Sequence, residues 1–231
     1  MSYSLIIPIY NEVKTLPILL KQLHTLESVN EIILIDDGST DGSQNILNHH
    51  CDINESILIK NKFNLGKGQS IKKGIEIASS TNVILADADL EIDIEAISYL
   101  IEKHELMLNE PKANNVLVGV RKSQENQNGL TLLDLGNKLI NFIFNLIYKS
   151  NFEDILCCLK IINKNQILNF NLSSQGFEIE TEIMAKIAKN KFLVKQVNID
   201  YKPRSVEDGK KIKKSDSYYI FKKMIKEKFI R

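Results

Sequence analysis

Three acidic side chains follow a short apolar run in the first half of the sequence, spaced as Asp87-x-Asp89-x-Glu91. Carboxylate oxygens are the ligands that hard divalent ions such as Mg²⁺ and Mn²⁺ prefer, and these ions also bind phosphate oxygens. An ion held there can stabilise a departing diphosphate as a Lewis acid. The alternative is that the acids only cap the next helix, because Asp and Glu favour helix N-termini. We predict a site for Mg²⁺ or Mn²⁺ and keep capping as the alternative.

A glycine-containing segment, Asn64–Gly68, is the second candidate for phosphate chemistry. Glycines allow close approach of the backbone, and the N-terminus of the helix that follows favours anions. The segment lacks the spacing of a Walker loop. It is not a dinucleotide fingerprint either, because Ile71 stands where the third glycine would be. These departures argue against an NTPase or a dehydrogenase, and a plain strand-to-helix turn remains the simpler interpretation.

Both segments belong to a set of four polar segments that each follow an apolar run: 8–12, 36–42, 64–68 and 87–91. The apolar runs alternate with amphipathic stretches, which is the pattern of a mostly parallel α/β sheet. In such a sheet the carboxyl ends of the strands lie at one edge, where ligands bind. We therefore expect the four segments to face one crevice.

The predicted elements position these segments. We expect strands at Ser4–Ile9, Glu31–Ile35, Ser56–Ile59, Val83–Ala86, Asn115–Val120, Ile155–Ile162 and Phe192–Ile199. We expect helices at Thr15–Leu26, Asp41–His49, Gly68–Ala78, Ile92–His104, Leu130–Tyr148, Phe177–Ala188 and Ser215–Ile230.

Composition excludes several function classes. The 231 residues carry 30 basic and 29 acidic side chains, a balance that indicates no nucleic-acid partner. The three cysteines, Cys51, Cys157 and Cys158, lack the spacing of a zinc site and fit a reducing cytosol. The chain begins on a strand-like run and contains no apolar stretch of about 18 residues, so we expect neither a signal peptide nor a membrane span.

The sequence resembles family-2 glycosyltransferases, and within them the dolichol-phosphate-mannose-synthase-like branch. The matching segments are IIPIYNE (6–12), ILIDDGSTDGS (33–43), NLGKGQSIKKGIEIA (64–78), ILADADLE (84–91), VGVR (118–121), GNKLINFIFNLIY (136–148), DILCCLKIINK (154–164), GFEIETEIMAKIAK (176–189) and YKPRSVEDGKKI (201–212). They occur in family order along nearly the whole chain, which is more specific than any single motif.

The resemblance implies a GT-A fold, a Rossmann-like α/β domain with a mostly parallel sheet, flanking helices and a short C-terminal helical region. It implies one glycosyltransferase domain over residues 1–231, in which 1–121 bind the nucleotide sugar. Residues 122–231 would form the acceptor side and a basic tail.

The resemblance also implies roles for single residues. The donor would be bound by Pro8, Tyr10, Glu12, Asp37, Lys67, Asp87, Ala88, Asp89, Arg204 and Lys210. The metal ligands would be Asp87, Asp89 and Glu91, the acceptor side would include Arg121 and Glu178, and catalysis would depend on Asp89, Glu180 and Arg204. Arg204 suits its role because a guanidinium can bind phosphate oxygens bidentately.

The implied reaction is an inverting transfer from a GDP- or UDP-sugar. A hydroxyl acceptor needs a general base, whereas a polyprenyl or dolichyl phosphate is already anionic. No lone Asp stands in an obvious base position, which favours the lipid phosphate. The alternatives are a transferase acting on a saccharide acceptor in cell-envelope polysaccharide synthesis and a non-catalytic nucleotide-sugar-binding module. A nucleotidyltransferase is disfavoured because IPIYNE is not a glycine-rich loop.

Two segments are candidates for contact with a membrane surface. Leu130–Tyr148 is apolar at helical spacing, which a buried core helix would explain equally well. From Tyr201 to Arg231 there are 11 Lys/Arg against 4 Asp/Glu, and aromatic residues lie among the cations of 215–231. A basic amphipathic helix can lie on an anionic bilayer, although a docked helix with solvated lysines fits the same pattern. We expect a cytoplasmic protein with peripheral contact at the inner face of the membrane, directly or through a membrane partner protein.

Overall fold

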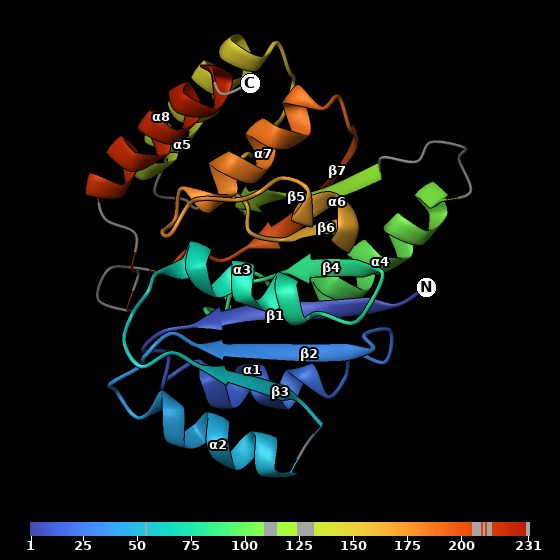
Figure 1. Cartoon of the computed structure of the whole chain (residues 1–231), viewed down its shortest axis with the longest axis vertical. Coiled ribbons are helices and arrows are strands. Elements are labelled where there is room, and N and C mark those ends of the chain that lie inside the picture. The colour runs from blue at the N-terminus through green and yellow to red at the C-terminus, as the bar shows by residue number, and fades with distance from the viewer. Residues whose placement is uncertain are drawn as a thin grey trace.

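Seven strands form one mixed sheet in the order β3-β2-β1-β4-β6-β5-β7 (Figure 1). The computed structural model describes residues 1–53, 55–108, 115–123, 132–204, 209, 211 and 214–229. The strands are β1 (Tyr3–Ile9), β2 (Glu31–Asp36), β3 (Ile57–Lys60), β4 (Asn82–Leu85), β5 (Asn115–Ser123), β6 (Lys160–Asn163) and β7 (Leu193–Tyr201). Neighbours pair in parallel except at β6, which is antiparallel to both β4 and β5. The predicted mostly parallel sheet is confirmed.

The helices agree with the predicted ones to within a few residues, with one addition. They are α1 (Leu16–Leu23), α2 (Ser43–Ile53), α3 (Lys67–Ile77), α4 (Glu95–Leu108), α5 (Leu132–Tyr148), α6 (Lys164–Leu168), α7 (Ile179–Lys189) and α8 (Lys214–Phe229). The short helix α6 was not predicted. Asn163 caps it by accepting hydrogen bonds from the backbone N–H groups of Asn165 and Gln166. The predicted strand at 155–162 was too long, because only its last residues belong to β6.

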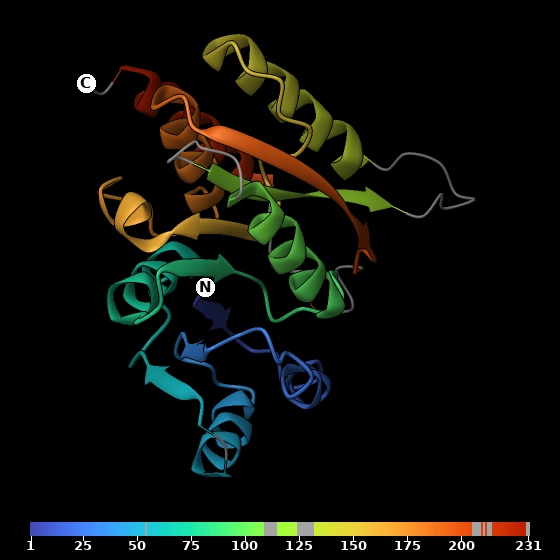
Figure 2. The same cartoon turned by 90° about the vertical axis from the view of Figure 1, so that its right-hand side faces the viewer.

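The sheet is buried on both faces, which is why its central strands are continuously apolar. Leu5 and Ile7 of β1 pack in a core with α1, α2 and α4, whereas Ile6 packs on the other face with α3 and α7. Figure 2 shows this separation, with α3 on one side of the sheet and α1 and α4 on the other. A Cβ at Gly74 would lie 2.4 Å from Cγ2 of Ile6, so α3 reaches β1 this closely only because a glycine stands there.

Both parts of the chain that the sequence suggested contribute to this one sheet. Strand β6 comes from the second part and lies between β4 and β5 of the first. The division at residue 121 stays a prediction. None of the helices in the described part of the chain combines the length and the apolar character needed to cross a membrane.

His104 gives the fold a testable pH dependence. Its Nδ1 lies 3.1 Å from the hydroxyl of buried Tyr3. Burial lowers the pKa of His104 to about 4, whereas a histidine in the unfolded chain titrates near pH 6.5. The unfolded state therefore binds more protons between these values, and stability should fall as the pH falls through this window.

We expect the unfolding free energy to drop by on the order of 2 kcal/mol more in the wild type than in His104→Gln between about pH 6.5 and pH 4. Urea titrations of both proteins at several pH values measure this difference. Parallel pH profiles for the two proteins would show that His104 makes no such contribution.

Candidate active site

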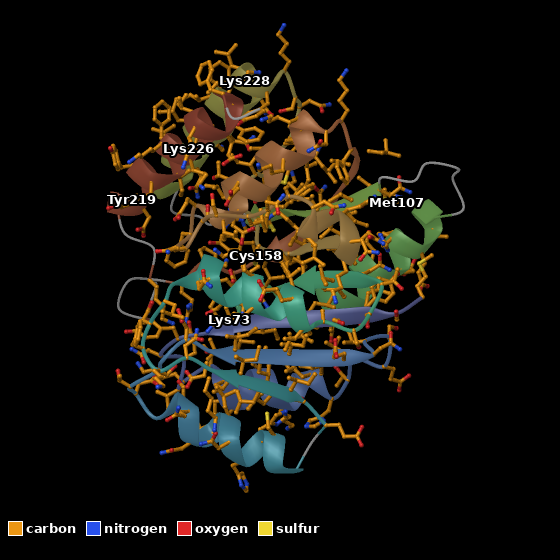
Figure 3. The ribbon with its side chains drawn as sticks, in the orientation of Figure 1. Lys73, Met107, Cys158, Tyr219, Lys226 and Lys228 are labelled. Carbon is orange, nitrogen blue, oxygen red and sulfur yellow. The ribbon has the colours of Figure 1, made fainter. Side chains whose placement is uncertain are left out.

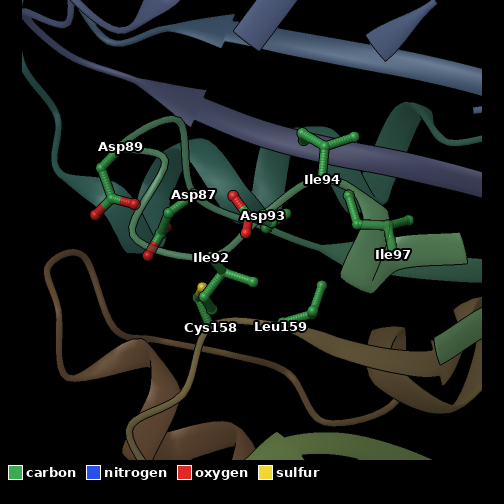
Figure 4. Close-up of a pocket in the computed structure, with 9 residues that line it drawn as sticks. Asp87, Asp89, Ile92, Asp93, Ile94, Ile97, Cys158 and Leu159 are labelled. Atoms are coloured by element: carbon green, nitrogen blue, oxygen red, sulfur yellow. The ribbon is translucent and has the colours of Figure 1, made fainter. Parts of the chain in front are cut away.

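The polar segments meet at one edge of the sheet, as predicted. Strands β1 to β4 are mutually parallel, so the loops that follow them all lie at the same edge of the sheet, where the carboxyl ends of these strands meet. The loop after β4 carries Asp87 and Asp89, and Cys158 and Leu159 lie on the segment facing it (Figure 4). A shallow pocket opens between these two segments.

Asp87 begins a line of alternating charges that runs into the protein. Its carboxylate pairs with Lys67 at the start of α3, with Oδ1 2.7 Å from Nζ. Lys67 also lies 3.0 Å from Glu180 of α7, and Glu180 pairs in turn with Lys160, whose side chain is fully buried at the start of β6. Each charge is therefore neutralised by its neighbours, which is the condition for burying ions at all.

These contacts decide how the ends of the line titrate. Burial alone would raise the pKa of Asp87. The Lys67 ammonium lowers it by more than burial raises it, so the pKa of Asp87 lies below its ordinary value. Burial would likewise lower the pKa of Lys67, yet Asp87 and Glu180 raise it well above the usual range. Asp87 and Lys67 are therefore a permanent ion pair at neutral pH.

Asp89 is electrostatically different from Asp87. Burial, together with the negative charges of Asp87 and Glu91, raises the pKa of Asp89 to about 7. Among the described residues, the Arg204 guanidinium lies close to it, with Nη2 3.6 Å from Oδ2, and the Asp89 side chain is 23% exposed. Leu90 takes a left-handed conformation with φ of 58°, and the next backbone N–H donates to Asp89 Oδ1 over 3.0 Å. Within the acidic loop, residues 87–91, ionisation of Asp89 is thus disfavoured, and its side chain is partly exposed.

Glu91 joins the acidic loop to the end of β7. One carboxylate oxygen accepts from the Tyr201 hydroxyl over 2.8 Å, and the other accepts from the backbone N–H of Arg204 over 2.9 Å. The backbone N–H of Lys202 donates to the Glu91 carbonyl over 2.8 Å. In this arrangement Glu91 positions the segment that carries Arg204.

Arg204 reaches across the site to the segment after β1. Its Nη1 and Nη2 donate to the two carboxylate oxygens of Glu12 over 2.9 and 3.1 Å, a bidentate pair. Lys211 contacts the same carboxylate. The guanidinium therefore lies between Glu12 and Asp89. Lys210, the other predicted cation of this segment, lies outside the described residues.

The acidic loop, residues 87–91, carries carboxylates of the type that bind divalent cations, and Asp89 is the candidate principal ligand. Among the described residues, no three His, Cys, Asp or Glu side chains come together closely enough to enclose an ion. Asp87 faces Lys67 and Glu91 faces β7, whereas Asp89 carries negative charge that protein groups only partly balance. Carboxylate oxygens of Asp89 and Asp87 fit Mg²⁺ or Mn²⁺. Both oxygens of Glu91 accept hydrogen bonds from the end of β7 and beyond it, and both oxygens of Asp87 contact Lys67, which makes Asp89 the first candidate ligand.

Other predicted donor-binding residues support the loops. The Asp37 carboxylate accepts from the backbone N–H groups of Leu65 and Gly66 and from the Asn61 amide, over 2.7 to 2.9 Å. It therefore holds the glycine-containing segment in place. Ala88 packs into the core, so only its backbone faces the site. Pro8 and Tyr10 lie half-buried at the end of β1 and beyond it, at the same edge.

The predicted acceptor-side residues have protein partners. Arg121 forms a bidentate pair with Asp154, with distances of 2.7 and 2.9 Å, and its guanidinium lies 5.1 Å from the ring centre of Tyr201. The Arg121 interaction outweighs burial and lowers the pKa of Asp154. Glu178 accepts from the backbone N–H groups of Gln175 and Gly176, just before α7.

Sequence reasoning missed three of these partners, namely Lys160, Asp154 and Tyr201. A lysine inside an apolar run, as at Lys160, was a usable signal, because a buried lysine needs an acidic partner.

Glu180 is buried between Lys67 and Lys160, so we expect it to stabilise the site, and its part in catalysis stays a prediction. Replacing it with glutamine leaves the buried Lys160 without its acidic partner, and breaking a buried pair costs about 3–5 kcal/mol. Glu153→Gln is the control, because Glu153 pairs with Lys122 at the exposed surface and such pairs contribute about 0–1 kcal/mol. Urea unfolding of both variants tests the difference. Wild-type stability combined with lost turnover in Glu180→Gln would instead assign Glu180 a part in the reaction.

The mixed seven-stranded sheet with helices on both faces is the GT-A fold, which the solved structures similar to this chain share. Residues 4–167 match the family described as Glycosyl transferase family 2, so the chain belongs to this family.

Three proteins illustrate the similarity. The chain is 27% identical over 199 residues to glycosyltransferase AglJ of Haloferax volcanii, covering 85% of the chain and 62% of that protein. It is 30% identical over 228 residues to undecaprenyl-phosphate 4-deoxy-4-formamido-L-arabinose transferase of Proteus mirabilis, covering 96% and 64%. The chain thus spans less than two thirds of either relative. Glucosyl-3-phosphoglycerate synthase from Mycobacterium tuberculosis, solved with Mn²⁺ and UDP-glucose, shares the fold at a TM-score of 0.74 and 14% identity, covering 100% of the chain and 80% of that structure.

Proposed function

We propose that this chain transfers a sugar from a nucleotide-diphosphate sugar to a polyprenyl phosphate, with inversion at the anomeric carbon. An oxygen of the acceptor phosphate attacks the anomeric carbon, the bond from that carbon to the donor diphosphate breaks, and the nucleoside diphosphate leaves. Asp89, with Asp87, would hold Mg²⁺ or Mn²⁺, which supplies Lewis-acid stabilisation of the leaving diphosphate. Arg204 would bind the same diphosphate from the opposite side of the site.

The choice of acceptor rests on the partners of the carboxylates in the site. Asp87, Glu12 and Glu180 are paired with cations, and Asp37 and Glu91 accept hydrogen bonds. Among the described acids of residues 87–91, this leaves Asp89, and we assign it to the cation. A hydroxyl acceptor would need a carboxylate base, whereas a phosphate needs none. The undecaprenyl phosphate in the name of the Proteus mirabilis relative supports the same acceptor class, as does the resemblance to the dolichol-phosphate-mannose-synthase-like branch.

A panel experiment tests this function. The protein and Mn²⁺ are incubated with UDP- and GDP-sugars and one of three acceptors, which are a short-chain polyprenyl phosphate, the matching polyprenol and a soluble oligosaccharide. Mass spectrometry detects the product. We expect product from the phosphate alone, with one donor preferred. Transfer to the oligosaccharide would favour the alternative function in polysaccharide synthesis, and donor binding without any transfer would favour a binding module.

A further inference from the structure

Phe63 is an exposed aromatic residue at the edge of the sheet where the candidate site lies. It follows β3, and 66% of its surface is exposed. Its neighbours in the sequence, Lys62 and Asn64, are exposed and polar, so its loop presents no larger apolar patch. Single exposed apolar residues are common. What distinguishes Phe63 is the position of the loop that carries it.

This loop, residues 61–66, lies directly on the turn that follows β2, and we call it the β3 loop. The backbone N–H of Asn61 donates to the Asp36 carbonyl over 2.8 Å. A Cβ at Gly38 would lie 2.7 Å from Cα of Phe63, so the loop and the turn approach this closely only because Gly38 has no side chain. Phe63 is therefore held beside the turn at the carboxyl end of β2.

Hydrogen bonds anchor the β3 loop on both sides of Phe63. The Asp37 carboxylate accepts from Asn61 before it and from Leu65 and Gly66 after it. Lys73 donates to the side-chain oxygen of Asn61, and Figure 3 labels Lys73 at α3, next to the first strands. A ring on an anchored loop loses little conformational freedom when a ligand binds, which favours affinity.

Tyr10 lies on the other side of the same turn. Strands β1 and β3 are the two neighbours of β2 in the sheet, so the residues that follow them flank the residues that follow β2. The backbone N–H of Asn11 donates to Ser39 Oγ over 3.0 Å, and the backbone N–H of Thr40 donates to Asn11 Oδ1 over 2.7 Å. Two aromatic residues, half-buried Tyr10 and exposed Phe63, therefore flank one turn.

We propose that Phe63 forms an aromatic wall opposite Tyr10 and stacks on the base of the nucleotide donor. Strands β1 and β3 are two strand spacings apart, about 9.5 Å. A flat base between two aromatic rings at van der Waals contact takes up about 7–8 Å, which fits between these strand ends. The phenyl ring has no hydrogen-bonding group, so it recognises a flat aromatic group of either base rather than one base.

This inference rests on the proposed function, in which the donor is a nucleotide sugar. The sheet order β3-β2-β1-β4 places the two aromatic residues and the acidic loop at successive strand ends. A nucleotide with its base beside Phe63 can therefore extend its diphosphate toward Asp89. The aromatic wall adds a contact to the base, whereas the acidic loop and Arg204 are assigned to the diphosphate.

Calorimetric titration of the full chain in Mn²⁺ with UDP, GDP and inorganic pyrophosphate tests the proposal. Phe63→Ala should weaken binding of the nucleotide that the wild type prefers by about tenfold or more, because base stacking is lost. Binding of pyrophosphate, which has no base, should change less than about twofold. Phe63→Tyr keeps the ring and should bind like the wild type. Tyr99→Ala, which removes an exposed aromatic side chain from α4, is the matched control. Circular dichroism verifies folding.

Equal nucleotide affinity in the wild type and Phe63→Ala would overturn the proposal. So would an equal loss of nucleotide and pyrophosphate binding, because Phe63 would then only shape its loop. Transfer assays separate this question from the proposed function. Weaker nucleotide binding in Phe63→Ala without any transfer by the wild type would support the stacking and refute the function. Transfer with an unchanged donor KM in Phe63→Ala would refute only the stacking, and a wild type that binds neither UDP nor GDP would refute both.

Discussion

Asp89→Ala is expected to reduce turnover on the order of 1,000-fold, because it would remove the proposed principal ligand of the ion that stabilises the leaving diphosphate. The same variant should fold normally. In the metal-free protein, burial and the charges of Asp87 and Glu91 raise the pKa of Asp89 to about 7. Ionisation of Asp89 is therefore less favourable in the native state than in the unfolded chain, and it destabilises the native state as the pH rises to about 7. We expect Asp89→Ala in EDTA to gain on the order of 1–2 kcal/mol relative to the wild type between pH 5 and pH 8.

Steady-state kinetics and urea unfolding measure the two parts of this prediction. Asp93→Ala is the matched control, because Asp93 follows in the same loop but pairs with Lys202 at the exposed surface. It should keep near-wild-type turnover. Binding of Mn²⁺, followed by electron paramagnetic resonance, should weaken in Asp89→Ala and not in the control. Undiminished turnover in Asp89→Ala, or wild-type activity that EDTA does not reduce, would refute the metal-binding role.

Arg204→Ala is expected to lower kcat about 100-fold and to change the donor KM only a few-fold, because charge on the leaving diphosphate grows in the transition state. The structure places the guanidinium between Glu12 and Asp89, at the edge where the diphosphate would depart. Arg204→Lys should recover only part of the loss, since an ammonium keeps the charge but not the bidentate geometry.

Lys202→Ala is the control for Arg204, because its side chain is exposed and lies two residues earlier in the same segment. Initial rates across a range of donor concentrations separate kcat from KM. A raised KM with unchanged kcat would show that Arg204 binds ground state and transition state equally. In that case the arginine would be an ordinary donor-binding residue.

Much of the architecture could be predicted from local patterns. The period of apolar residues separates strands from helices over nearly the whole chain. The parallel order of the first strands brought the four polar segments to one edge, as expected. The position of strand β6 was harder to predict, because a short apolar segment does not indicate in which direction it runs or which strands it pairs with. Its place between β4 and β5 depends on pairing with strands far away in the sequence.

The role of α5 shows a second limit. A helix that is apolar on both sides is normally interpreted as buried. Here the helix lies at the outside of the fold, so only the side bearing Phe144 is covered and the side bearing Phe142 faces outward. Neighbours decide which side of a helix is buried, and hydrophobic periodicity does not contain that information.

The sequence by itself determined which chemical groups stand at the ends of the strands, because local periodicity places each strand and so identifies the residues that follow it. It therefore predicted the positions of Asp87, Asp89 and Glu91. Only the tertiary structure decided which of these carboxylates keeps unbalanced charge. Asp87 is neutralised by Lys67, 20 residues away, and both oxygens of Glu91 accept hydrogen bonds from residues 110 and 113 positions away. Asp89 accepts a hydrogen bond within its own loop, and its other oxygen lies 3.6 Å from the Arg204 guanidinium. The electrostatic energy of two charges depends on the distance between them in space. Folding sets that distance, and the separation of the two residues in the sequence does not predict it.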